Sequence, residues 1–82
     1  MTIEAKHNLN DKIKFIKMGK VVTGFIVGVS CYTFMNSGDI NTVIRYEVAT
    51  DIGKLDVLEE DAFTEEEMKK VIHNLGNNLG NQ

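Results

Sequence analysis

The most apolar stretch of the chain runs from Val21 to Val29 and reads VVTGFIVGV. Side chains of a β-strand alternate between the two faces of a sheet, so a strand with one face in water shows apolar and polar residues in alternation. In this stretch Thr23 is the only polar side chain, and Phe25 and Val27 are apolar where a solvated face calls for polar residues. The pattern therefore predicts a β-strand that needs covering on both faces.

Three other segments alternate in the way that half-buried strands do. They are residues 11–18, 42–50 and 54–58. In the first of them, Ile13 and Phe15 are expected to face inward. Residues typical of tight turns, such as glycine, asparagine, aspartate and serine, separate the segments. The chain is therefore expected to form four strands that follow one another in a meander.

The second strand is expected to continue beyond the apolar stretch to Phe34, which makes it much longer than the usual length of about five or six residues. It contains Gly24 and Gly28, and a glycine inside a strand commonly marks a bulge or a bend. We expect this strand to bend and to change, along its length, which alternate side chains face inward.

A helix is predicted near the C-terminus. Thr64 and Glu67 have the spacing of a capping box, in which each side chain bonds the backbone amide of the other. Glutamates in the first turn also suit the positive end of the helix dipole. The pattern predicts a helix over 64–76 that ends at Gly76. Its apolar stripe consists of Met68, Val71, Ile72 and Leu75.

Together these elements predict a mainly β protein: a small SH3-like antiparallel barrel of four to five strands with one C-terminal helix. Closing a small sheet into a barrel removes the unpaired edges that a flat sheet exposes. An OB-like barrel is the nearest alternative, but it usually needs a helix between strands, for which residues 36–41 are too few. The predicted organisation is a flexible arm at 1–10, the barrel at 11–63, the helix at 64–76 and a mobile tail at 77–82.

The length of 82 residues limits the chain to one domain with a small core, because a chain this short buries only about 60 % of its unfolded surface. A single cysteine excludes an internal disulfide bond. The start of the chain lacks the charged residues and apolar stretch of a secretory signal, and no apolar run reaches the length of a membrane span. We therefore expect a cytoplasmic protein that does not enter a membrane.

The net charge of −3 is unevenly distributed. Residues 1–35 hold five lysines against two acidic residues, whereas residues 36–82 hold ten acidic residues against four basic ones. Nonspecific DNA binding depends on neutralising phosphates with basic side chains. The acidic second part of the chain therefore disfavours a nucleic-acid partner.

No pattern in the chain points to catalysis, a metal or a cofactor. A nucleophilic Cys31 would need a base beside it, but His7 and His73 are expected in the arm and in the last helical turn. We expect Cys31 to be a small packed strand residue. A structural zinc site takes four cysteine or histidine ligands, and the chain has three such residues. The acidic clusters 59–61 and 65–67 suit a solvated loop and a helix cap, so we expect no enzyme and no small-molecule substrate.

Four segments form a combination of motifs: DKIKFI at 11–16, GKVVTGFIVGV at 19–29, IRYEV at 44–48 and LEEDAFTEEE at 58–67. In this combination the chain resembles small SH3-like-barrel proteins of phages, plasmids and integron cassettes, and the resemblance covers residues 11–67. It implies the barrel fold and an accessory role in binding a host protein. The motifs specify the fold better than the function. Phe25 and Val27 depart from the family pattern, which tolerates polar residues there.

The apolar excess favours a protein-binding surface. We expect a non-enzymatic accessory protein that binds a host protein, or a second copy of itself as a homodimer, through an apolar face of the barrel. The candidate binding residues are Phe25, Val27, Tyr32 and Phe34. Burial of a large apolar side chain is worth about 1.5–3 kcal/mol, a sizeable part of the stability of so small a domain. In the alternative that needs no partner, the C-terminal helix covers Phe25 and Val27.

A small nucleic-acid-binding barrel is the other alternative. Four lysines lie on or beside the first strand, namely Lys12, Lys14, Lys17 and Lys20. With Tyr32, Phe34 and Tyr46 they could form a basic, aromatic platform for a single strand. Lysines also protect exposed strand edges from pairing with other chains, so their presence has a structural explanation as well.

Overall fold

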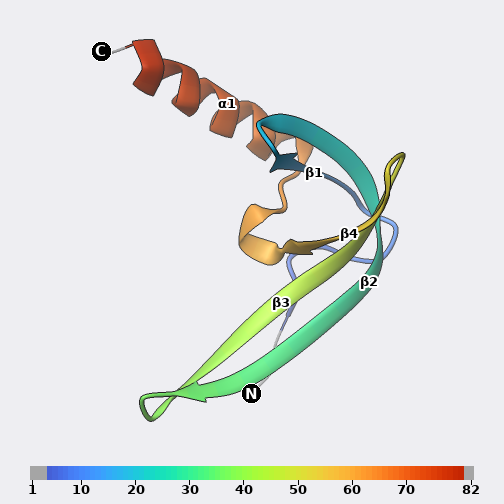
Figure 1. Cartoon of the computed structure of the whole chain (residues 1–82), viewed down its shortest axis with the longest axis vertical. Coiled ribbons are helices and arrows are strands. Elements are labelled where there is room, and N and C mark those ends of the chain that lie inside the picture. Colours follow the sequence, from blue (N-terminus) through green and yellow to red (C-terminus); the bar gives the residue numbers. More distant parts are fainter. Residues whose placement is uncertain (1–3, 81–82) are drawn as a thin grey trace.

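The computed structural model describes residues 4–80 of the chain, with side chains described through Gly76. Four strands, one 3-10 turn and one helix follow one another along the chain (Figure 1). They are β1 (Lys12–Lys17), β2 (Lys20–Asn36), β3 (Asp39–Thr50), β4 (Gly53–Leu58), η1 (Glu59–Asp61) and α1 (Glu65–Gly80). The predicted mainly β fold with a C-terminal helix is confirmed.

The strands form one open antiparallel sheet in the order β1-β2-β3-β4. Two of its hairpins turn through two residues that both have positive φ: Met18 and Gly19 at 52° and 78°, and Ser37 and Gly38 at 53° and 85°. Turns of this hand match the right-handed twist of paired strands. The turn residues therefore help to set the pairing register of both hairpins.

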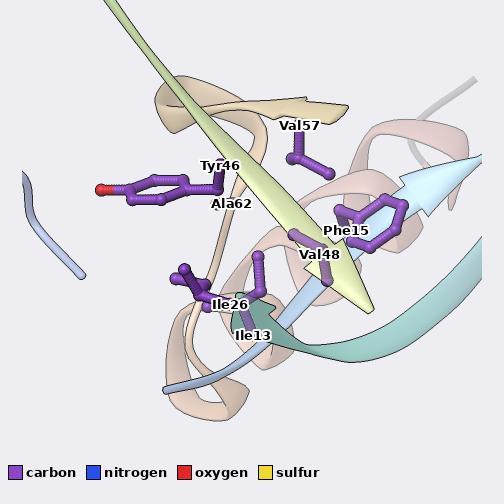
Figure 2. Packing of buried hydrophobic residues seen from close by; sticks show 7 residues of the cluster. All are labelled: Ile13, Phe15, Ile26, Tyr46, Val48, Val57 and Ala62. Carbon is purple, nitrogen blue, oxygen red and sulfur yellow. The ribbon is translucent and has the colours of Figure 1, made fainter. Parts of the chain in front are cut away.

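The hydrophobic core lies on one face of the curved sheet, where side chains from all four strands converge (Figure 2). Its buried members are Ile13, Phe15, Ile26, Tyr46, Val48, Val57 and Ala62. Ile13 and Phe15 are 0 % and 4 % exposed, which confirms their predicted inward orientation. Ala62, just after η1, brings the end of the β-rich region back to this cluster.

A bulge at Val27 changes the orientation of β2. The pairing with β3 shifts between Ile26, which lies opposite Val48, and Gly28, which lies opposite Glu47. Inward-facing positions are therefore even-numbered before the bulge and odd-numbered after it, because an extra residue reverses the alternation of faces. The predicted change of parity along this strand is confirmed.

The sheet does not close as the predicted barrel would. The described residues form an open sheet, with β1 and β4 as its outer strands. The outer edge of β1 is bonded at one position: the Lys14 amide donates to the Phe63 carbonyl at 2.7 Å, and the Phe63 amide donates to the Lys14 carbonyl at 2.9 Å. Only residues 62–63 separate η1 from the helix cap at Thr64, which leaves no room for a full fifth strand.

The predicted capping box of α1 is present. The Thr64 amide donates to Glu67 Oε1 at 2.9 Å, and the Glu67 amide donates to Thr64 Oγ1 at 3.2 Å. The first bond lowers the pKa of the Glu67 carboxyl, because a hydrogen bond from an amide favours the charged form.

The helix is longer than predicted. Gly76 was expected to end it, but this residue does not take the left-handed conformation of a helix-ending glycine, and α1 continues to Gly80. The segment 77–82, expected as a mobile tail, is thus helical through Gly80, and residues 81–82 lie outside the described part of the chain.

The N-terminal segment, expected as a flexible arm over 1–10, packs against the sheet in its described part. His7 is 7 % exposed, and its ring lies edge-on to Tyr46 with 5.5 Å between the ring centroids. The Asn10 amide donates to the Ile26 carbonyl at 2.8 Å. These contacts involve residues distant in sequence, so the polar character of the segment did not reveal them. Residues 1–3 lie outside the described residues.

We expect Gly24→Ala to destabilise the fold. A Cβ atom at this buried position would lie 2.5 Å from Val48 Cγ1 and 2.6 Å from the Ala49 carbonyl oxygen, and overpacking of this kind costs about 1–3 kcal/mol. Gly76→Ala is the matched control, because its Cβ meets no atom within 4 Å and alanine is favoured over glycine inside a helix by about 0.5–1 kcal/mol. Urea denaturation measures both, and equal stabilities would contradict the close approach at Gly24.

Candidate protein-binding surface

The hairpin of β2 and β3 extends well beyond the rest of the sheet. β1 pairs with β2 as far as Phe25, and β4 pairs with β3 from Arg45. Residues 29–36 of β2 have no β1 partner and residues 39–44 of β3 have no β4 partner. Together they form a ribbon, two-stranded from Cys31 and Ile44 outward, that projects away from the remaining elements (Figure 1). This segment is called the ribbon below.

The ribbon begins where the hydrophobic core ends. Tyr46 is fully buried, but Val29, directly opposite on β2, is already 44 % exposed. Farther out, Tyr32 is 66 % exposed, and the cross-strand partners Met35 and Ile40 are 73 % and 66 % exposed. Large apolar side chains therefore face water along the ribbon.

The bulge places three of the predicted binding residues on the same face. Phe25 precedes the bulge and Tyr32 and Phe34 follow it, so the reversal of parity puts all three on the face opposite the core. The rings of Tyr32 and Phe34 are stacked, with 5.7 Å between centroids and 18° between planes. Without the extra residue, Phe25 would lie on the other face from this pair.

The predicted binding residues form a strip rather than a compact patch. Phe25 is 53 % exposed and Val27, at the bulge, is 44 % exposed. At roughly 3.3 Å per residue, Phe25 and Tyr32 lie about 20 Å apart along the strand. We call Phe25, Val27, Tyr32 and Phe34 the outer strip.

The C-terminal helix leaves the outer strip uncovered. α1 contacts β1 and is anchored by Met68, which is 2 % exposed. Ile72 and Leu75, farther along its predicted apolar stripe, are each 50 % exposed. Because Phe25 and Val27 keep about half of their surface in solvent, the alternative in which the helix covers them is wrong.

Three exposed residues on the core-side face of the ribbon were missed from the sequence: Val29, Met35 and Ile40. The third strand was expected to start at residue 42 but begins at Asp39, so Ile40 was assigned to the turn. The available signal was the length of β2, since the small core of an 82-residue chain is too short to cover 17 strand residues.

A cluster of polar contacts ties the N-terminal segment to the base of the ribbon. The Tyr46 hydroxyl donates to Glu59 Oε2 at 2.7 Å and accepts from the His7 amide at 3.1 Å. The Lys6 amide donates to the same carboxylate oxygen at 2.9 Å. Figure 2 shows the Tyr46 hydroxyl pointing out of the apolar cluster, toward this segment. His7 Nε2 is buried without a hydrogen-bond partner among the described residues.

These contacts shift two pKa values in opposite directions. Burial, helped by the hydrogen bond to Glu59, raises the pKa of the Tyr46 hydroxyl. Burial also pushes the pKa of the Glu59 carboxyl upward, but the hydrogen bonds from the Lys6 amide and the Tyr46 hydroxyl outweigh it and leave that pKa lowered. The pair is therefore a neutral tyrosine donating to an ionised glutamate at neutral pH.

The lysines of the nucleic-acid alternative are not gathered beside the stacked rings of the ribbon, although Lys12 lies on the outer face directly opposite Phe25. Lys12 and Lys14 lie on the outer face of β1, whereas Lys17 and Lys20 lie opposite each other beside the turn between β1 and β2. Tyr46, the third ring of the predicted platform, is fully buried. The stacked pair on the ribbon lies beyond the end of β1, far along β2 from these lysines.

Cys31 is exposed, which corrects the expectation of a packed strand residue. It lies on the ribbon opposite Ile44, which is half-buried at the edge of the core. Within residues 4–80, no group of three or more His, Cys, Asp and Glu side chains is placed to hold a metal ion. No helix of the described chain combines the length and the apolar character needed to cross a membrane.

Comparisons with known proteins found no match among protein-family models, curated proteins or solved structures.

We expect Glu59→Gln to lower the free energy of unfolding by about 1 kcal/mol at neutral pH, because the ionised carboxylate is a better acceptor than an amide. Because folding lowers the pKa of Glu59, its ionised carboxylate stabilises the fold fully at pH values above the ordinary pKa of 4.5. This stabilisation is lost as the pH falls through the lower pKa of the folded state. The difference in the free energy of unfolding between wild type and Glu59→Gln should therefore be smaller when urea denaturation is measured at about pH 3.

Glu60→Gln is the control for this experiment, since Glu60 is the exposed neighbour on the same 3-10 turn. It should match wild type at both pH values. The lowered pKa of Glu67 also makes stability depend on pH, but Glu67 is present in wild type and in both variants, so its effect cancels when they are compared. A Glu59→Gln deficit that is the same at neutral and acidic pH would contradict the ionised hydrogen bonds described here.

Proposed function

We propose that this protein is a non-enzymatic accessory protein, of the kind that phages and mobile elements encode, that binds a protein partner in the cytoplasm through the outer strip and the ribbon. The observation that carries the proposal is the exposure of Tyr32 at 66 % and Phe25 at 53 % on one face, with Phe34 stacked on Tyr32. The partner is a host protein or a second copy of the chain.

Physical chemistry supports a binding role for such a surface. Single apolar residues are common on protein surfaces, but contiguous apolar stretches mark interaction sites. Aromatic residues are enriched in interfaces and supply many of the side chains that dominate binding energy. The stacked pair is already ordered by its own contact, so binding it would cost little side-chain entropy.

We propose, further, that the fold is a reduced SH3-like barrel whose last strand has shrunk to one bridge. A barrel closes when its final strand pairs with its first, and the two reciprocal hydrogen bonds between Phe63 and Lys14 follow that direction of closure. This interpretation agrees with the resemblance carried by residues 11–67.

The proposed function predicts that single polar substitutions on the outer strip strongly weaken partner capture. Immobilised wild-type protein should retain one or more specific proteins from lysate of the cells that encode it. Tyr32→Ser and Phe25→Ser should each reduce their retention by about tenfold or more, as expected for the loss of a dominant interface side chain. Both residues are exposed, so the fold should remain intact by circular dichroism.

Ile52→Ser provides a matched control, because Ile52 is as exposed as Tyr32, at 66 %, but lies in the turn between β3 and β4. It should leave capture unchanged. If Ile52→Ser reduces capture as strongly as Tyr32→Ser does, the capture is nonspecific hydrophobic adsorption. The proposed function would then lose its support.

The nucleic-acid alternative makes a different prediction. Fluorescence anisotropy with single- and double-stranded probes at low salt should show no binding, because the lysines lie far from the stacked rings and the chain carries a net charge of −3. Binding that weakens with salt and falls on Lys12→Ser would favour the alternative over the protein-binding function.

A further inference from the structure

Along the ribbon, β2 has a free edge that presents backbone N–H and C=O groups. This edge is distinct from the face that carries the exposed rings. In an antiparallel pair, every second residue turns its N–H and C=O away from the partner strand. β1 ends its pairing at Phe25, and the last outward backbone bonds are those that Ile26 makes with Asn10 and Asp11. From residue 29 to residue 36, no strand of the described chain pairs with this edge.

We infer that the occupant of this edge is a second copy of the same chain, so that residues 29–36 of two molecules pair antiparallel about a two-fold axis. The inference rests on the proposed function and names the partner of the same surface. Unpaired edges of this kind add strands from other chains unless charged residues, prolines or bulges block them.

The composition of the edge favours self-association. The segment reads VSCYTFMN and contains no charged residue and no proline. By contrast, β1 carries Lys12, Lys14 and Lys17, which is the usual protection of an edge strand. Two copies of a chain with net charge −3 carry a net repulsion for each other. The uncharged edge is a place where they can meet without like charges face to face.

The two-fold axis fits best at Thr33. Asn36 and Asp39 flank the two-residue turn and bond each other, so every second residue before Asn36 also bonds β3. The residues between them, of which Thr33 is one, turn their backbone groups away from β3. An axis there sets Thr33 opposite Thr33 of the second copy, and Tyr32 opposite its Phe34. The stacked pair would then continue as four aromatic rings on one face of a four-stranded ribbon.

The other edge of the ribbon, on β3, is less suitable. Its free part is shorter, residues 39–44, because β4 pairs with β3 from Arg45 onward. It carries Asp39 and borders a hollow of about 350 Å³ whose lining includes two acidic residues, Glu59 and Glu60, and one basic residue, Arg45. Two copies that met along β3 would bring these acidic groups toward each other.

Thr33→Lys and Thr42→Lys form a matched pair that tests the edge. Thr33 and Thr42 are cross-strand neighbours with 3.3 Å between their Oγ1 atoms, and both are exposed. Light scattering coupled to size-exclusion chromatography over a range of concentrations should show a wild-type dimer. Thr33→Lys should weaken the dimer by at least about tenfold because it sets two lysines face to face. Thr42→Lys should retain the dimer.

A disulfide tests the register. In a Cys31→Ser background, Thr33→Cys places two cysteines opposite each other at a separation of about 5.5 Å between Cα atoms, which a disulfide can bridge. Mild oxidation should link this variant into covalent dimers. Thr42→Cys in the same background should link far less, since its cysteines would lie three strand spacings apart.

The outcomes separate this inference from the proposed function. A wild-type monomer at all concentrations, or a dimer that Thr42→Lys rather than Thr33→Lys disrupts, overturns the inference. If such a protein still captures a partner in a Tyr32-dependent way, the binding function stands and the partner is another protein. A dimer that Thr33→Lys disrupts, with efficient cross-linking through Thr33→Cys, supports the second copy as the occupant.

Discussion

Tyr46 lies at the boundary of the hydrophobic core, and that boundary decides which parts of the protein face solvent. Its ring is fully buried in the apolar cluster, while its hydroxyl donates to Glu59 at the surface. Opposite it, Val29 is already half exposed. The core of so short a chain is too small to extend farther, so the remaining length of β2 and β3 projects as a ribbon. The candidate binding surface is therefore a consequence of core size.

The bulge at Val27 is the second feature on which the surface depends. It allows Ile26 to face the core before the bulge and Val29 to face the same side after it, so the strand keeps one apolar face while it bends. The same extra residue places Phe25 on one face with Tyr32 and Phe34. A strand without it would divide these rings between two faces, and neither face would carry a continuous strip.

Much of the fold could be predicted from the sequence, because its signals are local. Alternation in residues 11–18 identified Ile13 and Phe15 as core residues, and the capping box at Thr64 identified the start of α1. The predicted helix end at Gly76 was wrong, because this glycine does not take the left-handed conformation of a helix cap. Burial of His7 was not foreseen, because its contacts with Tyr46 join residues far apart in the sequence.

By itself, the sequence determined the number of strands, the position of the turns, the start of the helix and the excess of apolar residues on β2. These features depend on the period of side chains along the backbone and on residues that favour turns and caps. The tertiary structure alone decided that the sheet stays open, that α1 leaves Phe25 uncovered and that Cys31 lies in water. Each of these outcomes depends on which distant segments pack together, and local patterns carry no information about that choice.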